Sequence, residues 1–530
     1  MHITTFKTKI LLFFIFGMVI LYSSFYYNAL NGADDTFFRD FHFDSVSEPL
    51  VLDNAFKDQE GITHKFSNLG YITMKGASER VDLIKQAYIF TDKTKKSISN
   101  IPVIKYGSKE DNDNVVFVDC TYLTKVMSAI GYQIVIGKES RFVKNVVLQD
   151  KLAKISYYGE VLPQTDNSKL SLNFESFGKQ YIDIAEYTSQ YGLQGQIVSF
   201  LFNKLNLSIK TIQKMNVIFF SFIILVLTCL FYKIFSKSLA VCFLISVTFS
   251  PWVVSFASDL YWIEFSWFLP AVFSWLLWFK RNKTERFVLY FCIYLTCWFK
   301  CLSGYEYFSS VLLFAVAPYF YACLTTKTKI DFIKNLKILL AIGVIGVLGF
   351  ISALLMHAYI RSGGNIAEGL STIWHKDVLR RTMGGDIKDF DFIKGKEAIR
   401  LYELSFNANA FDVVKEYISI WKTSVLNFPI LDQFSFKSML GLSALAILVE
   451  YVTGNKQKAR NNISLFVVFI IPALSWYILG KSHSFMHTPL NYVLWYMGGV
   501  SSLIYIIYTE FIKIGDADKI LDTFANTNQI

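Results

Sequence analysis

The sequence contains few of the residues on which disulfide-rich or metal-binding proteins depend. Only seven of its 530 residues are cysteine, and five of these lie in apolar runs: Cys229, Cys242, Cys292, Cys297 and Cys323. Cys120 lies in a clearly polar region, where it has no obvious partner. These positions predict no structural disulfide, and their spacing matches no metal motif.

The chain also lacks the clustered charge that attracts nucleic acid, and no internal repeat is visible in it. The formal net charge is +10, but the basic residues mostly lie in short segments between apolar runs. Lysine and arginine at such places orient membrane helices. We therefore expect no nucleic-acid partner. An inverted-repeat transporter stays open as an alternative, because inverted repeats often leave only faint traces in sequence.

Apolar and aromatic side chains are what the chain has in abundance. Hydrophobic residues make up 53% of it, including 50 Phe, 30 Tyr and 10 Trp, and the mean hydropathy is +0.37. A soluble globular protein rarely has this composition. Several apolar runs reach about 18 residues, the length that a helix needs to cross the hydrocarbon core of a bilayer. The composition predicts an all-α polytopic membrane protein.

Ten segments are predicted to be transmembrane helices. They lie near residues 10–28, 214–232, 239–256, 262–279, 286–301, 308–324, 336–357, 438–453, 463–480 and 490–509. The first has the position of a signal peptide, but its length and the lack of a small-x-small cleavage site favour an uncleaved anchor.

The charges between these segments predict the side of the membrane that each loop occupies. With the amino terminus inside, every short inside loop is basic, as the positive-inside rule requires. The basic residues of the five loops are Lys7 and Lys9; Lys233 and Lys237; Lys280, Arg281, Lys283 and Arg286; Lys327, Lys329, Lys334 and Lys337; and Lys456, Lys458 and Arg460. The pattern predicts an even number of spans and two cytoplasmic termini.

The same topology leaves two long polar segments outside. The predicted organisation is a first membrane helix at 1–28, a first external loop at 29–212, spans two to seven at 213–357, a second external loop at 358–437, spans eight to ten at 438–510 and a cytoplasmic tail at 511–530.

Each external loop has its own pattern. In the first, apolar and polar residues alternate at 114–118 and 132–136 as in strands, whereas 79–88 and 123–129 are helix-like, so we predict an inserted α+β domain. The second is rich in Gly, Asp and Lys over 363–396, which predicts a mobile loop. It is amphipathic over 397–421, which predicts helices near the membrane surface.

An acidic pair, Asp34 and Asp35, follows the first apolar segment directly. A carboxylate at the edge of a bilayer is costly unless it meets water, a cation or a substrate, so the pair is either a solvated loop or a site. Arg39 lies four residues after Asp35 and can pair with it on one helical face. Asp34 is then left as the candidate general base.

Polar residues that suit a sugar come just before the second span. They are Tyr187, Gln190, Tyr191 and Gln194. Amide and phenol groups can bind sugar hydroxyls, and aromatic surface can cover the C–H face of the ring. The alternative is an ordinary loop that leads into an interfacial helix.

Charged residues also gather at the predicted outer ends of the third and fifth spans. Asp259 and Glu264 could orient a substrate or neutralise Lys300, or they could have a purely structural role. Lys300 goes against the positive-inside trend, so it either snorkels to the interface or holds an anion such as a lipid phosphate. Tyr305 and Glu306 extend this polar group.

The ninth span ends in a fourth polar group, with Lys481, His483, His487 and Asn491. The two histidines are four residues apart and can share a helical face. Zinc would need more ligands, so we predict no metal here. Lysine and imidazole are suitable donors to a phosphate, although simple interfacial packing is the alternative. Together, these groups predict an outward-facing cavity at the membrane surface.

The topology and the acidic pair resemble the GT-C glycosyltransferases, multispanning enzymes that use a polyprenyl-phosphate-linked sugar. In that superfamily the first external loop carries an essential acid and continues as interfacial helices toward the second span; Asp34, Asp35 and the 187–196 segment occupy corresponding places. The Asp-Asp-x-x-x-Arg arrangement further resembles bacterial membrane transferases that decorate O-antigen or other surface polysaccharides. The long insertion between about residues 50 and 178 departs from the smaller members.

The resemblance implies a hexosyltransferase-type enzyme in the bacterial inner membrane, active on the periplasmic face. It would move a sugar from undecaprenyl phosphate to a hydroxyl of a glycan such as O-antigen of lipopolysaccharide. Asp34 would deprotonate or orient the acceptor, and Lys300 with Lys481 or His483 would stabilise the leaving phosphate. The sugar, the stereochemical outcome and the involvement of a divalent cation stay open.

Three other functions remain open on the sequence alone. An O-antigen polymerase or ligase usually centres on a large late external loop with Arg and His, and the segment 361–396 could serve. A flippase or transporter would need polar residues through the middle of several spans, whereas here they gather at outer ends. A receptor is disfavoured because no cytoplasmic output domain is visible.

Overall fold

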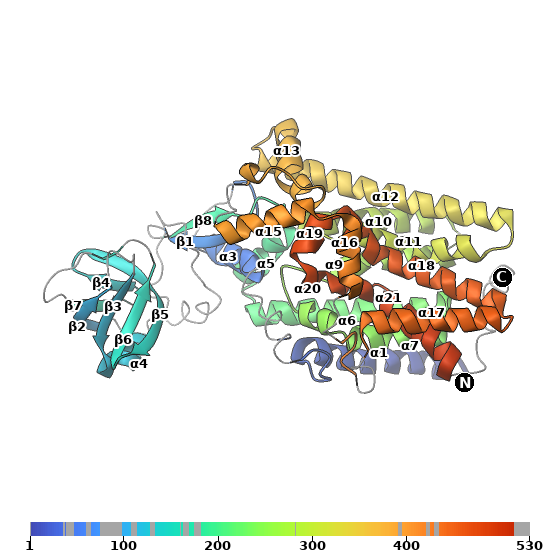
Figure 1. Cartoon of the computed structure of the whole chain (residues 1–530), viewed down its shortest axis with the longest axis horizontal. Coiled ribbons are helices and arrows are strands. Elements are labelled where there is room, and N and C mark those ends of the chain that lie inside the picture. Colours follow the sequence, from blue (N-terminus) through green and yellow to red (C-terminus); the bar gives the residue numbers. More distant parts are fainter. Residues whose placement is uncertain are drawn as a thin grey trace. The chain divides into compact units, whose positions relative to one another are not determined.

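The described chain forms two compact units (Figure 1). A computed structural model describes residues 2–34, 38, 47–59, 65–74, 98–107, 114–127, 133–158, 161–162, 169–173, 182–280, 282–390, 395–419, 424–428 and 434–512. The helical unit comprises residues 1–44, 189–193 and 208–530, and the strand-containing unit comprises residues 45–188 and 194–207. Each unit is described by itself below.

The helical unit contains five helices that are long and apolar enough to cross a membrane, counted over the described residues. They are α6 (Ile209–Ile234), α10 (Lys283–Ser303), α11 (Phe308–Thr325), α12 (Lys329–Arg361) and α18 (Lys456–Leu479). Each covers a segment that the sequence predicts to span. The prediction of a multi-pass helical membrane protein is therefore confirmed.

The other five predicted spans form shorter, broken or less fully described helices, so the structure reaches half of the predicted ten by this criterion. They correspond to α1 (His2–Tyr27), α7 (Lys237–Thr248) with α8 (Pro251–Phe256), α9 (Phe265–Leu276), α17 (Phe436–Val452) and α21 (Gly499–Ile507).

Local chemistry explains two of these breaks. Between α7 and α8, the Ser250 hydroxyl accepts a hydrogen bond from the Val253 N–H and Pro251 begins the next helix. Proline cannot continue a preceding helix, because it lacks the N–H donor. Before α21, Gly498 has a φ of 92°, a left-handed conformation that glycine adopts without a steric cost.

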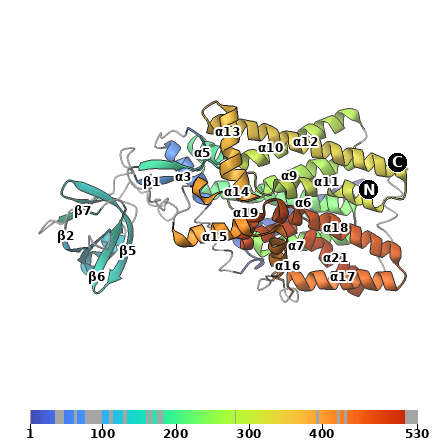
Figure 2. The same ribbon diagram turned by 45° about the horizontal axis from the view of Figure 1, so that its top comes forward.

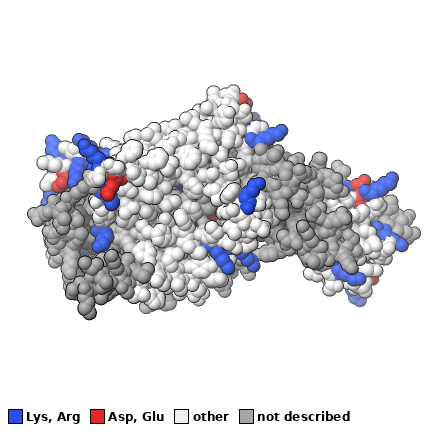
Figure 3. Space-filling view, turned by 180° about the vertical axis from the view of Figure 1, so that it is seen from behind, with Lys and Arg blue, Asp and Glu red and all other residues white. Residues whose placement is uncertain are grey.

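The long helices α10 and α12 expose apolar surface. On α12 the exposed side chains recur at helical spacing: Leu340, Val344, Val347, Leu348, Ile351 and Leu355. This spacing places them on one face of the helix. Figure 3 shows a broad, mostly white band of the helical unit, in which few Lys, Arg, Asp or Glu side chains appear, between basic residues on either side of it. Such a face suits contact with lipid, which offers no water to solvate charge.

Aromatic rings fill the core of the helical unit. The Phe231 ring lies 4.8 Å from the ring of Trp275 and 5.5 Å from that of Phe469. Helix α11 packs against α9, α12 and α18 and so lies near the centre of the bundle. Figure 1 shows α13, α15 and α19 at the end of the bundle where α12 finishes.

The prediction of a mobile loop over 363–396 is wrong for most of that segment. The chain forms α13 (Ile366–Ile373), a π-helical turn (Trp374–Val378), α14 (Leu379–Arg381) and a 3-10 turn (Ile387–Asp389). The Asn365 side chain caps α13 by accepting a hydrogen bond from the Glu368 N–H. The predicted amphipathic helices are present as α15 (Lys396–Asn407) and α16 (Ala410–Ser419).

Two very short helices complete this end of the bundle. They are α19 (Lys481–Met486) and α20 (Thr488–Asn491), which follow α18.

The strand-containing unit confirms the predicted α+β insertion and includes a closed six-stranded barrel (Figure 2). The barrel order is β2 (Ile98–Tyr106), β3 (Val115–Asp119), β6 (Leu152–Tyr157), β5 (Glu139–Gln149), β4 (Gln133–Ile136) and β7 (Lys169–Asn173). All paired strands are antiparallel, and β3 pairs with β6 through Phe117 and Lys154. Strands β3 and β4 lie at the two predicted positions.

The rest of this unit is a small two-stranded sheet with helices. Strands β1 (Gly70–Met74) and β8 (Ile182–Glu186) pair, and α3 (Glu48–Gln59) packs on β1. Helix α4 (Leu123–Met127) matches a predicted helix, and α5 (Leu193–Asn203) precedes the first long span. The helix-like stretch 79–88 lies outside the described residues.

Candidate functional site

The turn between α10 and α11 carries the central carboxylate of the site, Glu306. Its two oxygens accept hydrogen bonds from the Gln190 Nε2 at 3.0 and 2.9 Å. An Arg381 guanidinium nitrogen lies 3.0 Å from the Glu306 Oε1, and both side chains are largely buried. Burial raises the pKa of Glu306, but Arg381 and Lys300 more than offset it, so the pKa is lowered and the carboxylate stays ionised.

Gln190 joins this carboxylate to a second turn of the chain. Its Nε2 also donates to the Tyr261 hydroxyl at 2.8 Å. The Gly192 N–H donates to the Leu302 carbonyl, which fixes the 189–193 segment to the end of α10. Tyr261 and Glu306, which lie 71 and 116 residues from Gln190 in the sequence, thus meet around one amide, as a converging site requires.

Asp259 shapes the second turn. One of its carboxylate oxygens accepts hydrogen bonds from the N–H groups of Tyr261 and Trp262, at 2.7 and 3.0 Å. The Glu264 carboxyl is 1% exposed, and neither of its oxygens has a hydrogen-bond partner in the described chain. No ion pair between described residues joins Asp259 or Glu264 to Lys300, so the predicted neutralisation of Lys300 by these acids is not seen.

Lys300 lies on the last turn of α10 and is 3% exposed. Its ammonium donates one hydrogen bond, to the Gly304 carbonyl at 2.6 Å. An ammonium has three protons, so two have no acceptor among the described residues. This arrangement differs from snorkelling, because the side chain is buried and its ammonium bonds to a carbonyl of the adjacent turn.

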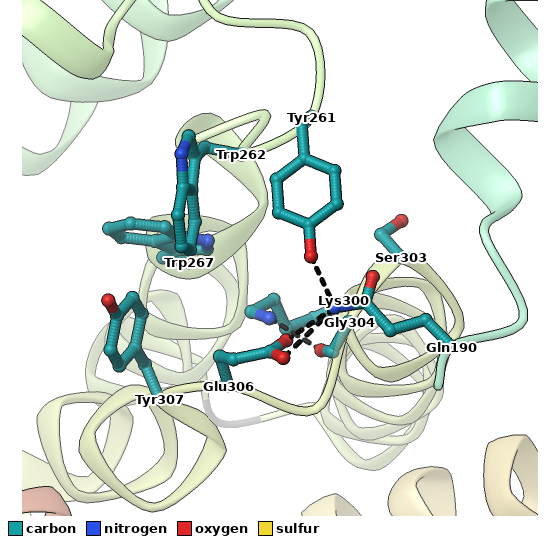
Figure 4. Close-up of a pocket in the computed structure, with 9 residues that line it drawn as sticks. All are labelled: Gln190, Tyr261, Trp262, Trp267, Lys300, Ser303, Gly304, Glu306 and Tyr307. Atoms are coloured by element: carbon teal, nitrogen blue, oxygen red, sulfur yellow. Dashed lines mark hydrogen bonds between the residues drawn. The ribbon is translucent and has the colours of Figure 1, made fainter. Parts of the chain in front are cut away.

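These groups line a narrow pocket with about 230 Å³ of empty volume, including the part open to solvent. The lining residues are Gln190, Tyr261, Trp262, Trp267, Lys300, Ser303, Gly304, Glu306 and Tyr307. Figure 4 shows the rings of Trp262, Trp267 and Tyr307 on one side and the polar ends of Tyr261, Gln190 and Glu306 on the other.

An arginine cluster closes the site from the segment after α12. Asp377, which is 3% exposed, pairs with Arg361 and lies 3.5 and 3.7 Å from Arg381 and Arg380. Arg381 therefore bridges Asp377 and Glu306. None of Asp377, Arg361, Arg380 and Arg381 is among the site residues predicted from the sequence. The sequence does contain a clue to this cluster, since three arginines and the acid lie within the segment 361–396, which was considered only as the external loop of a polymerase or ligase.

The short helices after α18 contribute imidazoles beside this cluster. The His483 ring lies 5.5 Å from that of Trp476, 6.2 Å from that of Tyr307 and 4.6 Å from that of His487. The His483 Nδ1 is buried and has no hydrogen-bond partner in the part of the chain that is described. Burial, followed by His487, Arg381 and Arg380, lowers the pKa of His483 well below its ordinary value. At pH 7 His483 is therefore a neutral donor or acceptor, and it adds no positive charge for a phosphate.

This shift predicts how stability depends on pH. The folded protein disfavours the protonated form of His483, whereas the unfolded chain protonates near pH 6.5. Stability is therefore fully present above that value and decreases as the pH falls below it, by at most about 1.4 kcal/mol per pH unit from this group. Thermal unfolding at pH 7 and pH 5 should show a smaller decrease in Tm for His483→Gln than for the wild type. An equal decrease would contradict the account.

Lys481 and Asn491 have structural partners. The Lys481 ammonium donates to the carbonyls of Phe406 and Ala408 at 2.7 and 2.6 Å, which ties α19 to the end of α15. The Asn491 side chain accepts a hydrogen bond from the Tyr307 hydroxyl at 2.6 Å and so holds one wall of the pocket.

Tyr305 and Tyr191 lie behind the turn. The Tyr305 hydroxyl is 3.1 Å from the Nδ1 of His357, which is fully buried in α12. Tyr191 packs with Cys301, Leu302 and Ala353. Both residues support the turn, and neither lines the pocket.

The remaining predicted residues lie elsewhere. Tyr187 and Gln194 belong to the strand-containing unit. Asp34 is exposed, in the loop after α1. In this loop the Asn28 side chain hydrogen-bonds the Ala33 backbone, and the Asn427 side chain donates to the Asn31 carbonyl. Asp35 and Arg39, and hence their predicted pair, lie outside the described residues.

Gly304 leaves room for the central hydrogen bonds. A Cβ at this position would lie 2.8 Å from the Glu306 Oε2 and 3.3 Å from both polar atoms of the Gln190 amide. We expect Gly304→Ala to separate these groups and to lower the free energy of unfolding by about 1–3 kcal/mol, as overpacking does. Thermal unfolding in detergent measures this. Gly343→Ala is the control, because nothing lies within 4 Å of its added Cβ. Equal Tm values would show that the space is not needed.

Comparison with protein-family models, curated protein sequences and solved structures finds no significant match to the chain. All seven cysteines are free thiols. No group of three or more His, Cys, Asp or Glu side chains suited to a metal ion occurs among the described residues. Function is therefore inferred from the geometry of the site.

Proposed function

We propose that this protein is a membrane glycosyltransferase that moves a sugar from a polyprenyl phosphate to a hydroxyl of a surface glycan. One observation carries the proposal. At one end of a membrane helix bundle, Glu306, Gln190 and Lys300 line a narrow pocket that has an aromatic wall, and Arg381 pairs with Glu306. Aromatic faces with adjacent amide and charged groups suit a sugar, and buried cations suit its phosphate.

In the proposed reaction, the bond between the anomeric carbon of the sugar and the phosphate oxygen breaks, and a bond from that carbon to the acceptor oxygen forms. We further propose that the acceptor proton passes to Asp34, an exposed carboxylate in the loop after α1. The polyprenyl phosphate leaves with the bonding electron pair. Arg380, Arg381 and Lys300 supply positive charge for the phosphate as it gains negative charge.

The proposed location is the bacterial inner membrane, with both termini in the cytoplasm and the site on the periplasmic face. The exposed apolar side chains of α10 and α12 support residence in a membrane. Under this proposal, the exposed surfaces of the spans also offer contacts for the prenyl tail.

A polymerase or ligase of lipid-linked glycans is the second candidate. The observation that favours it is the arginine cluster from the late segment. Arg361 and Arg381 pair with Asp377, and the charge of Arg381 helps to lower the pKa of His483. Such a protein would join whole glycan units, whereas the proposed transferase adds one sugar.

Mass spectrometry of surface glycans tests the proposal. A deletion strain should lose the mass of one sugar from each glycan repeat, and the wild-type gene should restore it. A ladder of chain lengths that collapses to single units would favour the polymerase. Accumulation of untranslocated lipid-linked sugar on the inner leaflet would favour a flippase. An unchanged glycan profile would reject the transferase.

A further inference from the structure

The ends at which α10 and α12 begin carry basic side chains that have no acidic partner. Two acids lie at the same ends, and each has another partner. Glu285 pairs with Lys280 at 3.4 Å, and Asp331 accepts a hydrogen bond from the Thr328 hydroxyl at 2.6 Å. No ion pair between described residues involves the basic residues of the first turns of α10 and α12, which are Lys283, Arg286, Lys329, Lys334 and Lys337.

Helices α10 and α12 run parallel to each other, so their basic ends lie together. Near their starts, side chains from 289–297 of α10 and 338–345 of α12 share one hydrophobic cluster. Near their ends, side chains from 298–302 and 350–360 share another. Figure 1 and Figure 2 both show the two helices side by side.

The basic residues also lie at matching heights along the two helices. Gly349 approaches α10 closely, since a Cβ added to it would lie 3.0 Å from the backbone nitrogen of Trp298, 51 positions earlier in the sequence. Two pairs of basic residues have the same separation, namely Lys283 with Lys334 and Arg286 with Lys337. Like charges at one height of adjacent helices repel, so an anion between them would stabilise this end of the bundle.

Each helix continues from its basic end into a stripe of exposed apolar side chains. On α10, exposed residues follow Lys283 at intervals of four positions, and they are Phe287, Phe291 and Leu295. On α12, exposed residues follow Lys337 at intervals of three or four positions, and they are Leu340, Val344 and Val347. Side chains at this spacing share one face of a helix. Each apolar stripe therefore ends in one lysine.

The charges and the apolar stripes together match the two parts of an anionic phospholipid. Ammonium and guanidinium groups form charge-assisted hydrogen bonds to phosphate oxygens. The exposed stripes offer acyl chains an apolar surface without polar groups to solvate. Clusters of Lys and Arg at one end of membrane helices attract anionic lipids, whereas a lipid without net charge lacks this attraction. Inorganic phosphate would use the charges alone.

We propose that the starts of α10 and α12 form a binding site for one anionic phospholipid. Its acyl chains lie along the apolar stripes, and its phosphate contacts the basic residues at matching heights, which are Lys283, Arg286, Lys334 and Lys337. The bound lipid offsets the repulsion between the helix ends and so stabilises the helical unit. The inference is independent of the proposed transferase activity, because it concerns the opposite end of α10 from the pocket.

Native mass spectrometry of the purified full-length protein in detergent tests the lipid site. The probes are phosphatidylglycerol, phosphatidylcholine with the same acyl chains, a polyprenyl phosphate and inorganic phosphate. We expect phosphatidylglycerol to bind about 10- to 100-fold more tightly than phosphatidylcholine, as two or more basic contacts imply. Added salt should reduce this preference, because it screens exposed charges.

A double variant and a matched control locate the site. Lys334→Gln with Lys337→Gln should reduce the preference for phosphatidylglycerol to about threefold or less. The control, Lys376→Gln with Lys388→Gln, removes two exposed charges from the segment after α12 and should keep the wild-type preference. Phosphatidylglycerol should raise the Tm of the wild type and of the control more than that of the site variant. If the double variant does not fold, Lys283→Gln and the comparison of lipids on the wild type still decide the question.

Four results would overturn the inference. They are equal affinity for the two phospholipids, an unchanged preference in the site variants, tighter binding of the polyprenyl phosphate than of phosphatidylglycerol, and an increase in Tm with inorganic phosphate as large as that with phosphatidylglycerol. None of these results rejects the transferase, because none concerns glycan transfer. Conversely, unchanged surface glycans in the deletion strain would reject the transferase and leave the lipid site standing.

Discussion

Replacement of Arg381 by methionine is expected to remove glycan transfer and to lower stability more than any other change at the site. Arg381 is the bridge between Glu306 and Asp377, and all three side chains are largely buried. Removing one partner leaves buried carboxylates less compensated, which costs about 3–5 kcal/mol in comparable cases. Thermal unfolding in detergent and the glycan mass profile measure the two effects.

A matched control separates this effect from a general loss of charge. Arg400 lies exposed on α15, so Arg400→Met removes the same charge without breaking a described ion pair. The double variant Arg381→Met with Glu306→Gln should lose less stability than the sum of the single variants, because the two side chains interact. Additive losses, or equal Tm values for Arg381→Met and Arg400→Met, would contradict the bridging role.

Asp34→Asn is expected to reduce transfer about 100- to 10,000-fold, the usual range for loss of a general base. The asparagine keeps the shape of the side chain but cannot take the acceptor proton. Because Asp34 is exposed, Tm should change little. Initial transfer rates on a defined acceptor measure the effect.

The control for Asp34 is Glu403→Gln, which neutralises an exposed carboxylate on α15. Both variants should fold, and only Asp34→Asn should lose transfer. Wild-type rates in Asp34→Asn would assign the base to another residue. The same pair of measurements on Asp35→Asn tests whether that acid is structural, as its predicted pairing with Arg39 implies.

Membrane residence and the inserted α+β domain could be predicted from the sequence because both depend on local patterns. Apolar runs identify α6, α10, α11, α12 and α18, and alternation identifies β3 and β4. The breaks at Ser250 and Gly498 were missed, since a window of apolar residues averages over one cap or one left-handed glycine. The helices over 366–381 were missed because their Gly and charged residues suggested a loop.

The outer ends of the spans were predicted to share one site, and Gln190, Lys300 and Glu306 do meet around one pocket. What each residue contacts could not be predicted, because tertiary contacts between residues 71 to 184 positions apart have no local signature. The Lys481 ammonium donates to a backbone carbonyl, and the Asn491 side chain accepts a hydrogen bond from the Tyr307 hydroxyl. Arg381, by contrast, pairs with Glu306 from a segment about 75 residues away.

Transfer by the purified protein in proteoliposomes tests the central claim most directly. The donor is a polyprenyl phosphate that carries a radiolabelled sugar, and the acceptor is glycan from the deletion strain. The account predicts that label moves to the glycan, that one polyprenyl phosphate is released per sugar transferred, and that Arg381→Met and Asp34→Asn remove the signal. Label that stays on the lipid with wild-type protein, or that only crosses the bilayer, would contradict it.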